Sequence, residues 1–257
     1  MDREYFNNYF HYERNHWWFK VRAQILRNRI SSITSGKKNI SILNIGAATG
    51  LTTELLSQFG NVTSVEFDKD CCEFLSKTFR WKVVNASITE LPFDTESFDL
   101  VCAFDVVEHV DDDQKGVNEM IRVCKTTGNI ILTVPAFMSL WSTHDEVNHH
   151  KRRYLRRQLE NLFPTDSGKI NYSSYFNSLL FIPIFLVRKF MNLLPSGTPK
   201  RNEKSDFALV NNKFLNAVFY LLFSLEIIWL KFMKFPFGVS ILLVFKKNFP
   251  GHANASK

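Results

Sequence analysis

The feature that most constrains the fold is a repeated change of hydrophobic period along residues 40–163. Short apolar or β-branched runs, typical of buried strands, alternate there with segments whose apolar residues recur at helical spacing. The strand-like runs are residues 40–46, 61–67, 81–86, 99–106 and 129–135, and the helical segments are 49–60, 68–79, 111–125 and 155–163. Strands that alternate with helices predict a parallel sheet covered on both faces. Right-handed crossovers then place ligand sites at the carboxyl ends of the strands.

The C-terminal third predicts two further strands with an apolar insertion between them. Residues 168–176 indicate a sixth strand, and residues 237–247 indicate a seventh, antiparallel strand at the edge of the sheet beside it. Two apolar helices, expected at 178–194 and 209–235, would form a helical cap over the site. We therefore expect one α/β core with two additions: a core of residues 39–176 and 236–248, an inserted cap of 177–235, and an aromatic N-terminal helical cap of 1–38.

Composition excludes several broad classes of protein. With 45% apolar and 22% charged residues in a chain of 257, the protein is not mostly disordered. Its four cysteines form no C-x-x-C pair and have no histidine at metal-ligand spacing, so we expect no zinc finger, no metal site, and reduced thiols in a cytoplasmic protein. The net charge of +7 allows an acidic partner. The single basic cluster at 151–157 lacks the interleaved aromatic residues of a nucleic-acid surface, so no nucleic-acid partner is expected.

The turn after the first expected strand carries the first chemical signal. Gly46 and Gly50 flank a tight strand-to-helix turn, where a ligand can approach backbone N–H groups, and Ala48 keeps the turn thin. Glu66 follows Gly46 by about 20 residues and ends the next strand, where a carboxylate can accept both hydroxyls of a ribose. A solvated loop acid is the alternative. The G-x-A-x-G spacing differs from the G-x-G-x-x-G of dinucleotide sites, which favours a nucleoside without a diphosphate.

Five segments in order resemble the class I S-adenosylmethionine-dependent methyltransferases, in the subgroup of ubiquinone and small-molecule enzymes. They are NIGAATG (44–50), VEFD (65–68), ELPFDTESFDLV (90–101), FDVVEHV (104–110) and NIILTVP (129–135). HWWF (16–19) with Arg22, and HDEVNHHKRRY (144–154), resemble a narrower branch that is common among enzymes of surface-glycan and lipid gene sets. The resemblance implies a Rossmann-like, doubly wound, seven-stranded and mostly parallel sheet. It also implies S-adenosylmethionine as the cofactor.

The resemblance assigns roles to residues at the carboxyl ends of the strands. Asn44 stands where the family usually has an acid, and Ala48 replaces its middle glycine; both departures suggest weaker binding of the cofactor. The acid that usually lies near the adenine amine is missing at Ala86 and Ser87. The implied cofactor contacts are Gly46, Ala48, Gly50, Phe104 and Asp105 around the methionine part, Arg22 at its carboxylate, Glu66 at the ribose, and Phe67, Ala86 and Ser87 at the adenine.

Methyl transfer to an oxygen requires a group that takes the acceptor's proton, and histidine is the usual choice. His109 follows the fourth expected strand, and His144 with Asp145 follows the fifth, so these three are the catalytic candidates. The alternative is that residues 144–154 form a structural lid whose side chains bond the backbone. A role in binding the acceptor is expected for Trp17 and for the lid residues His150, Arg152, Arg153 and Tyr154. Arg156 and Arg157 fit a solvated helix face.

The apolar insertion leaves two interpretations open. Residues 178–235 contain no run of the roughly 18 apolar residues that a spanning helix needs. Their lysines and arginines gather at the helix ends, so the insertion is either a cap packed on the sheet or a cap that also contacts an anionic membrane surface. The function we expect is methylation, at oxygen, of a small or lipid-linked acceptor. A non-catalytic binding protein of the same fold is the first alternative, and a nicotinamide-dependent oxidoreductase is the second.

Overall fold

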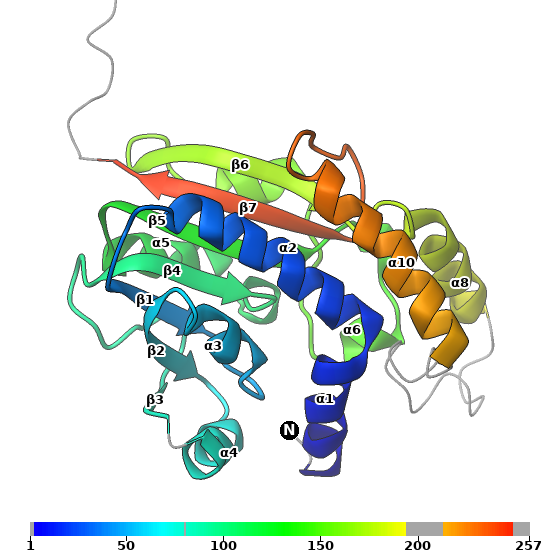
Figure 1. The fold of residues 1–257 in the computed structure, drawn as a ribbon, viewed down its shortest axis with the longest axis horizontal. Coiled ribbons are helices and arrows are strands. Elements are labelled where there is room, and N and C mark those ends of the chain that lie inside the picture. Colours follow the sequence, from blue (N-terminus) through cyan, green and yellow to red (C-terminus); the bar gives the residue numbers. More distant parts are fainter. Residues whose placement is uncertain (1–2, 80, 194–212, 249–257) are drawn as a thin grey trace, which may run out of the picture.

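The computed structural model describes residues 3–79, 81–193 and 213–248, and within them one seven-stranded sheet runs through the molecule (Figure 1). The strand order is β3-β2-β1-β4-β5-β7-β6. Strands β3 to β5 are parallel, and β7 pairs antiparallel with both β5 and β6. The strands are β1 (Ile40–Ile45), β2 (Gly60–Glu66), β3 (Val83–Asn85), β4 (Phe98–Phe104), β5 (Cys124–Pro135), β6 (Gly168–Phe176) and β7 (Ser240–Lys247).

This topology confirms the expected doubly wound α/β fold, with one correction at the edge of the sheet. The sequence placed the seventh strand at the edge, but β7 lies between β5 and β6, and β6 forms that edge. All eight residues of β7 pair with β6 or β5 along its length, and seven of them are buried. The reason is its apolar run on both faces, which is typical of a central strand and not of an exposed edge.

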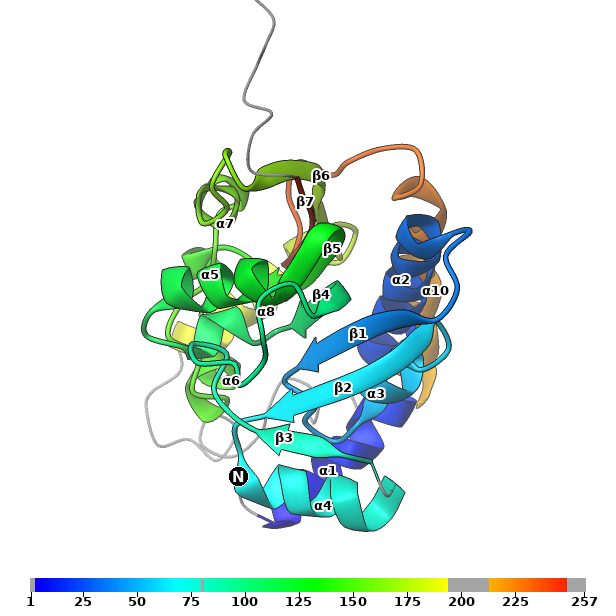
Figure 2. The same cartoon turned by 90° about the vertical axis from the view of Figure 1, so that its left-hand side faces the viewer.

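Helices cover both faces of the sheet (Figure 2). Helices α2, α3 and α10 lie on one side, and α5 and α7 lie on the other. The helices are α1 (Arg3–Asn15), α2 (Trp17–Thr34), α3 (Leu51–Leu56), α4 (Lys69–Phe79), α5 (Asp113–Val123), α6 (Thr143–Val147), α7 (Arg156–Asn161), α8 (Phe181–Leu193) and α10 (Lys213–Trp229), with short 3-10 turns η1 (Val107–His109) and η2 (Met138–Leu140). Helix α5 is shorter than predicted because Cys124 already pairs with Phe98 in the sheet.

The insertion between β6 and β7 is tied to the core through α10. Trp17 of α2 packs edge-on against Phe219 and Phe223, with ring centroids 5.5 and 5.8 Å apart. Glu226 is fully buried and accepts hydrogen bonds from the backbone N–H groups of Ser178 (2.7 Å) and Leu179 (2.8 Å) just after β6. Burial raises the pKa of Glu226 to about 7. One side of α10 is therefore fixed to α2 and to the end of β6.

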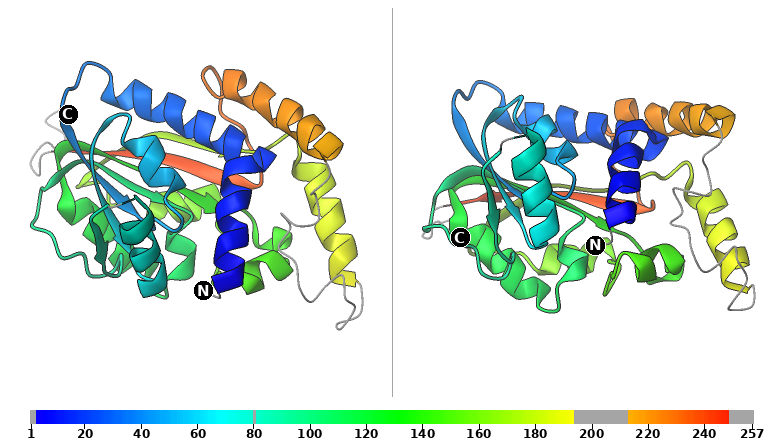
Figure 3. Two further views of the ribbon diagram at one scale, coloured as in Figure 1. Left: turned by 60° about the horizontal axis from the view of Figure 1, so that its bottom comes forward. Right: turned by 90° about the horizontal axis from the view of Figure 1, so that it is seen from below.

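The other side of the insertion is exposed and apolar. Helix α8 stands apart from the sheet (Figure 3) and is held to η2 by a hydrogen bond from Arg188 to the Leu140 carbonyl (2.8 Å). Among the described residues, no helix combines the length and hydropathy needed to cross a bilayer. Residues 194–212, which include the segment between the two expected apolar helices, lie outside the described residues. Large apolar side chains are exposed at Ile182, Leu186, Val187, Phe190, Phe214, Leu221, Ile228, Phe232 and Met233.

Candidate active site

The glycine turn after β1 has the tight geometry that its sequence predicts. Gly46, Ala48 and Gly50 all have positive φ angles, of 76°, 44° and 96°, and Gly50 is the N-cap residue of α3. A Cβ atom on Gly46 would lie 2.4 Å from Cγ2 of Val106, and one on Gly50 would lie 2.8 Å from the Trp81 ring. Both positions therefore require glycine, for conformation and for space.

Glu66 points its carboxylate at this turn. Its Oε2 accepts a hydrogen bond from the N–H of Ala48 (2.9 Å), and its Oε1 accepts one from the N–H of Asp68 (2.9 Å). The neighbouring Phe67 is 77% exposed. Asn85 fixes this corner, because its Nδ2 donates to the carbonyls of Glu66 (2.9 Å) and Phe67 (2.8 Å). Each carboxylate oxygen keeps a second lone pair for a hydroxyl donor.

The polar residues of β1 and β3 take different positions. Asn44 is buried beneath the turn, where its Nδ2 donates to the hydroxyls of Thr52 (3.0 Å) and Thr53 (2.9 Å). It therefore ties β1 to α3 from below. Ala86 and Ser87 follow β3, where the Ala86 N–H donates to the Glu66 carbonyl (3.2 Å). These two residues are partly buried beside the Glu66 corner.

Arg22 reaches from α2 to the ends of β4 and β5. Its guanidinium donates to Asp105 Oδ2 (2.5 Å) and to Thr133 Oγ1 (3.1 Å), and Thr133 in turn donates to Asp105 Oδ1 (3.0 Å). Asp105 has a positive φ of 58°, and the preceding Phe104 is buried. The Nε of Arg22 is buried with no hydrogen-bond partner. Arg22, predicted from its place after HWWF, is thus joined to Asp105, predicted from the loop after β4.

Helix α1, which belongs to the expected N-terminal helical cap, contacts the glycine turn through Glu13, a residue that the sequence analysis did not single out. It turns away from α2 and passes beside the carboxyl ends of the strands (Figures 1 and 3). Its buried Glu13 accepts a hydrogen bond from the hydroxyl of Thr49, inside the glycine turn. Burial raises the pKa of Glu13 to about 7. The only sequence signal for Glu13 is its position three residues before the HWWF segment.

The segment 144–154 is held together by one buried carboxylate. Asp145 accepts four hydrogen bonds: from Arg153 Nε (2.8 Å) and His150 Nδ1 (2.8 Å) at Oδ1, and from Arg153 Nη2 (3.0 Å) and the Ser142 N–H (2.9 Å) at Oδ2. Although burial opposes ionisation, the bonds from His150 and Arg153 hold the pKa of Asp145 well below its usual range. All four lone-pair positions are filled, so Asp145 orients His150 and not the adjacent His144.

The other predicted lid residues also make structural contacts. Arg152 donates to the carbonyls of Val110 (3.2 Å) and Asp111 (2.8 Å) and pairs with Asp113 (2.8 Å). Tyr154 is buried and its hydroxyl donates to the same Asp113 carboxylate (2.8 Å). These bonds match the lid alternative for Asp145, Arg152, Arg153 and Tyr154. Trp17, predicted to contact an acceptor, is instead buried against α10.

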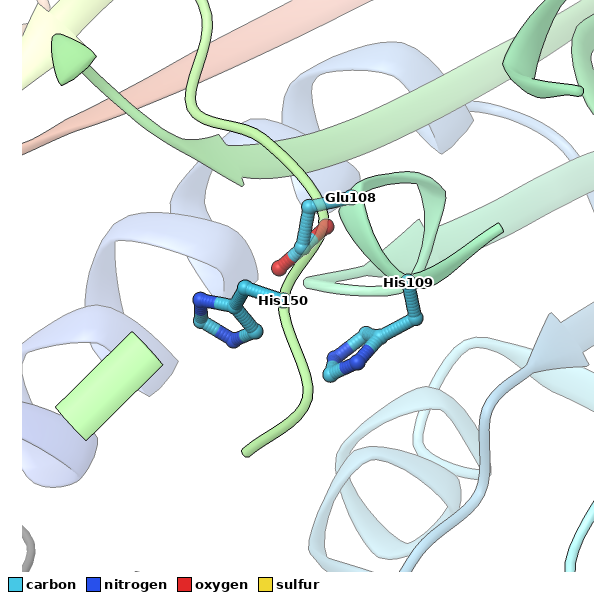
Figure 4. Close-up of side chains that lie close together, drawn as sticks. All are labelled: Glu108, His109 and His150. Carbon is cyan, nitrogen blue, oxygen red and sulfur yellow. The ribbon is translucent and has the colours of Figure 1, made fainter. Parts of the chain in front are cut away.

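Three potential ligands of a metal ion meet where the lid touches the loop after β4. Figure 4 shows the Glu108 carboxylate pointing into the space between the rings of His109 and His150. One donor atom from each of the three lies within 4.8 Å of the others. Burial raises the pKa of Glu108 well above its ordinary value, and burial together with His150 lowers the pKa of His109 to about 4. His150 follows His109 by about 40 residues in the sequence, so no local spacing of metal-ligand residues predicted this cluster.

The profile of the methyltransferase domain family matches residues 43–132, which include the glycine turn, Glu66, Asp105 and Glu108. Residues 43–132, about a third of the chain, are thus similar to methyltransferase domains, and this similarity implies S-adenosylmethionine as the cofactor. Among solved structures, a methyltransferase candidate from Bacillus halodurans aligns with 86% of this chain and 98% of its own, at a TM-score of 0.58 and 15% identity. The cyclase SpnF aligns with 88% of this chain and 81% of its own, at a TM-score of 0.55 and 14% identity.

Three curated relatives match parts of the chain. Demethylmenaquinone methyltransferase of Clavibacter sepedonicus is 33% identical over 96 residues, 35% of this chain and 39% of the relative. An uncharacterized protein of Methanocaldococcus jannaschii is 31% identical over 149 residues, 57% of this chain and 61% of the relative. Phosphatidylethanolamine N-methyltransferase of Cereibacter sphaeroides is 31% identical over 102 residues, 35% of this chain and 48% of the relative. The chain thus spans less than two thirds of each relative's length.

The residues present fit the cofactor of this methyltransferase family. The glycine turn leaves no room for side chains at Gly46 and Gly50, and the Glu66 carboxylate faces the same turn. The buried Arg22 has an unpartnered Nε beside Asp105, which suits a ligand that carries both a carboxylate and an ammonium group. The departures at Asn44 and Ala48 do not disturb this arrangement, because Asn44 bonds Thr52 and Thr53 and the N–H of Ala48 still reaches Glu66.

Proposed function

We propose that this protein transfers the methyl group of S-adenosylmethionine to an oxygen of a small or lipid-linked acceptor. The observation that carries the proposal is the Glu66 carboxylate bonded to the Ala48 N–H at a turn of three positive φ angles. A carboxylate fixed at that place can accept both hydroxyls of a ribose. The cofactor supplies an electrophilic methyl group on a sulfonium, and the protein supplies alignment and exclusion of water.

The proposed roles follow the positions of the side chains. Gly46, Ala48 and Gly50 let the methionine part approach the backbone, with Arg22, Phe104 and Asp105 around it, and Asn44 supports the turn from below through Thr52 and Thr53. Glu66 holds the ribose, while the exposed Phe67 ring, together with Ala86 and Ser87, flanks the adenine. Arg22 pairs with the cofactor carboxylate through its free Nε, and Glu13 and Asp105 lie close enough to the turn to accept from its ammonium group.

An oxygen acceptor needs a group that removes its proton. Among the three histidines near the site, His109 is a weak base because burial lowers its pKa to about 4. His150 is oriented by Asp145, and His144 is partly exposed in α6. His144 therefore remains our proposed base, with His109 and Asp145 acting on the position of the surrounding loop. The acceptor would enter between α6 and the loop after β4, near His150, Arg152 and Arg153.

A lipid-linked acceptor is favoured by the exposed apolar face of α8 and α10. Phe232 is 85% exposed and lies between Lys231 and Lys234, both also exposed. Apolar side chains beside lysines are typical of segments that lie on anionic membranes. Two of the relatives are named for a quinone and for a phospholipid substrate. Vesicles with anionic lipid should therefore bind the wild-type protein at low salt, and Phe232→Ser should bind less; equal binding to neutral vesicles would contradict the electrostatic part.

A non-catalytic or differently reactive protein is the alternative function. The cyclase SpnF has the same fold, so the fold by itself does not assign methyl transfer. The replacement of the usual acid by Asn44 and of the middle glycine by Ala48 also favours this alternative. A nicotinamide-dependent oxidoreductase is less favoured, because the turn lacks the third glycine of a dinucleotide site.

Calorimetry with S-adenosylmethionine, S-adenosylhomocysteine and NAD separates these functions. We expect one S-adenosylhomocysteine to bind per chain, and Glu66→Gln to weaken it by about 10- to 100-fold, since hydrogen bonds to a charged group contribute roughly 1.5–3 kcal/mol. Glu73→Gln, an exposed acid on α4 paired with Lys77, is the matched control and should bind normally. Binding of NAD alone, or of none of the three, would overturn the proposal.

A further inference from the structure

We propose that Glu108, His109 and His150 form a binding site for one divalent transition-metal ion at the carboxyl end of β4. Two imidazole nitrogens and a carboxylate are a common donor set for such ions, with the remaining coordination positions left for water or a substrate oxygen. One donor atom from each residue already lies within 4.8 Å of the other two. Ligands of a bound ion lie about 2.8–3.6 Å apart, given metal–ligand bonds of about 2.0–2.2 Å and angles between octahedral and tetrahedral, so small side-chain rotations complete the site.

The unpartnered carboxylate is the independent observation that points to a ligand. Glu108 is fully buried, and neither of its oxygens has a hydrogen-bond partner. Burying a polar group without a partner is unfavourable by roughly 1–3 kcal/mol or more, so such a group needs an explanation. A dication between Glu108, His109 and His150 supplies the missing partner. The nearby Asp105 is not the proposed ligand, because its carboxylate is already bonded to Arg22 and Thr133.

The histidines are also arranged as metal ligands usually are. The Nδ1 of His150 bonds Asp145 Oδ1 (2.8 Å), which fixes the ring and leaves Nε2 available. A carboxylate on the far nitrogen is the usual outer partner of a metal-bound histidine. The backbone of Asn148 and His149 in the lid lies beside the ring of His109. The rings of His109 and His150 stand nearly perpendicular, with centroids 4.7 Å apart.

The proposed site also explains why Asp145 and Arg153 are buried as a pair. Arg153 neutralises Asp145 and holds it against His150, so the lid fixes one ligand while η1 carries the other two. The ion would therefore join the lid to the loop that begins at Asp105. His109 is partly buried and the side chain of His150 is 9% exposed, so the proposed site lies just below the surface of the lid.

Metal titration of the chelator-treated full chain tests this site without any assay of methyl transfer. We expect Zn²⁺ to bind with one ion per chain in calorimetry, and Co²⁺ at the same site to give a visible absorption spectrum. Glu108→Gln and His150→Ala should each weaken Zn²⁺ binding at least about 100-fold, as loss of one ligand typically does. His149→Ala removes the exposed neighbour of His150 and is the matched control, which should bind normally.

The melting temperature distinguishes lost binding from lost folding. Glu108→Gln replaces a buried acid with a neutral amide, so the metal-free variant should melt no lower than the metal-free wild type. Zn²⁺ should raise the melting temperature of the wild type and of His149→Ala only. The proposal is overturned if the wild type binds no Zn²⁺, if Glu108→Gln retains it, or if His149→Ala loses it equally, which would indicate an adventitious surface site.

Discussion

The close approach of Val106 to Gly46 makes a quantitative prediction about the turn. Gly46 and Gly36 have nearly the same φ, 76° and 78°, but only Gly46 is crowded: a Cβ there would lie 2.4 Å from Val106 Cγ2, and Gly36 has nothing within 4 Å. Alanine at either position is strained in the left-handed conformation, which lowers the free energy of unfolding by roughly 1 kcal/mol. At Gly46 it also overpacks the site, which adds about 1–3 kcal/mol.

Urea denaturation of the two variants measures the difference. Gly36→Ala should lower the free energy of unfolding by about 1 kcal/mol, and Gly46→Ala by about 2–4 kcal/mol. Adding Val106→Ala to Gly46→Ala removes the clashing methyl group and should recover at least about 1 kcal/mol of that loss. Equal losses in the two glycine variants, or no recovery in the double variant, would refute the claim that space at Val106 shapes this turn.

Two further predictions concern buried carboxylates. Asp145→Asn leaves the buried Arg153 without its charged partner, so it should lower the free energy of unfolding by about 3–5 kcal/mol and the melting temperature by about 6–9 °C. The control Asp111→Asn removes an exposed pair with Lys151 and should change the free energy of unfolding by under about 0.5 kcal/mol. Equal melting temperatures of the two variants would contradict this. Because burial raises the pKa of Glu13 to about 7, the folded state binds its proton more tightly, so the contribution of Glu13 to stability should fall as the pH rises from about 5 to about 7, by up to about 3 kcal/mol. In urea denaturation, Glu13→Gln should therefore gain stability relative to the wild type over this pH range, while the slope due to Glu226 remains in both proteins; a difference between the two proteins that does not change with pH would contradict this.

The sequence predicted the parts of this molecule that depend on local pattern. Alternating strand and helix periods gave the parallel sheet, and two glycines with an acid at the end of the next strand gave the Glu66 corner. The order of β6 and β7 was wrong, because pairing between strands far apart in the chain leaves little trace in either strand alone. Burial of β7 on both faces was the signal that could have corrected it.

The parts that sequence could not give depend on contacts between distant segments. Glu13 contacts Thr49 because α1 folds back over the turn, and His150 lies near Glu108 because the lid packs on the loop after β4. The lid has no regular hydrophobic period from which its position could be predicted. Neighbours in the chain were misleading: Asp145 is adjacent to His144 but accepts its bonds from His150 and Arg153. Loops place side chains by tertiary packing, so adjacency is weak evidence of contact.

The position of β7 has a consequence for how the chain is assembled on the ribosome. Strand β6 pairs with β7 alone, and β5 pairs with β7 on one side, so residues 240–247 fill a gap between two strands made much earlier. Until those residues emerge, β6 has no neighbour and the nascent sheet ends at β5 with an open, apolar border. Such a border can pair with other chains, so the interval in which α8 and α10 are synthesised is the one in which this protein most needs a chaperone.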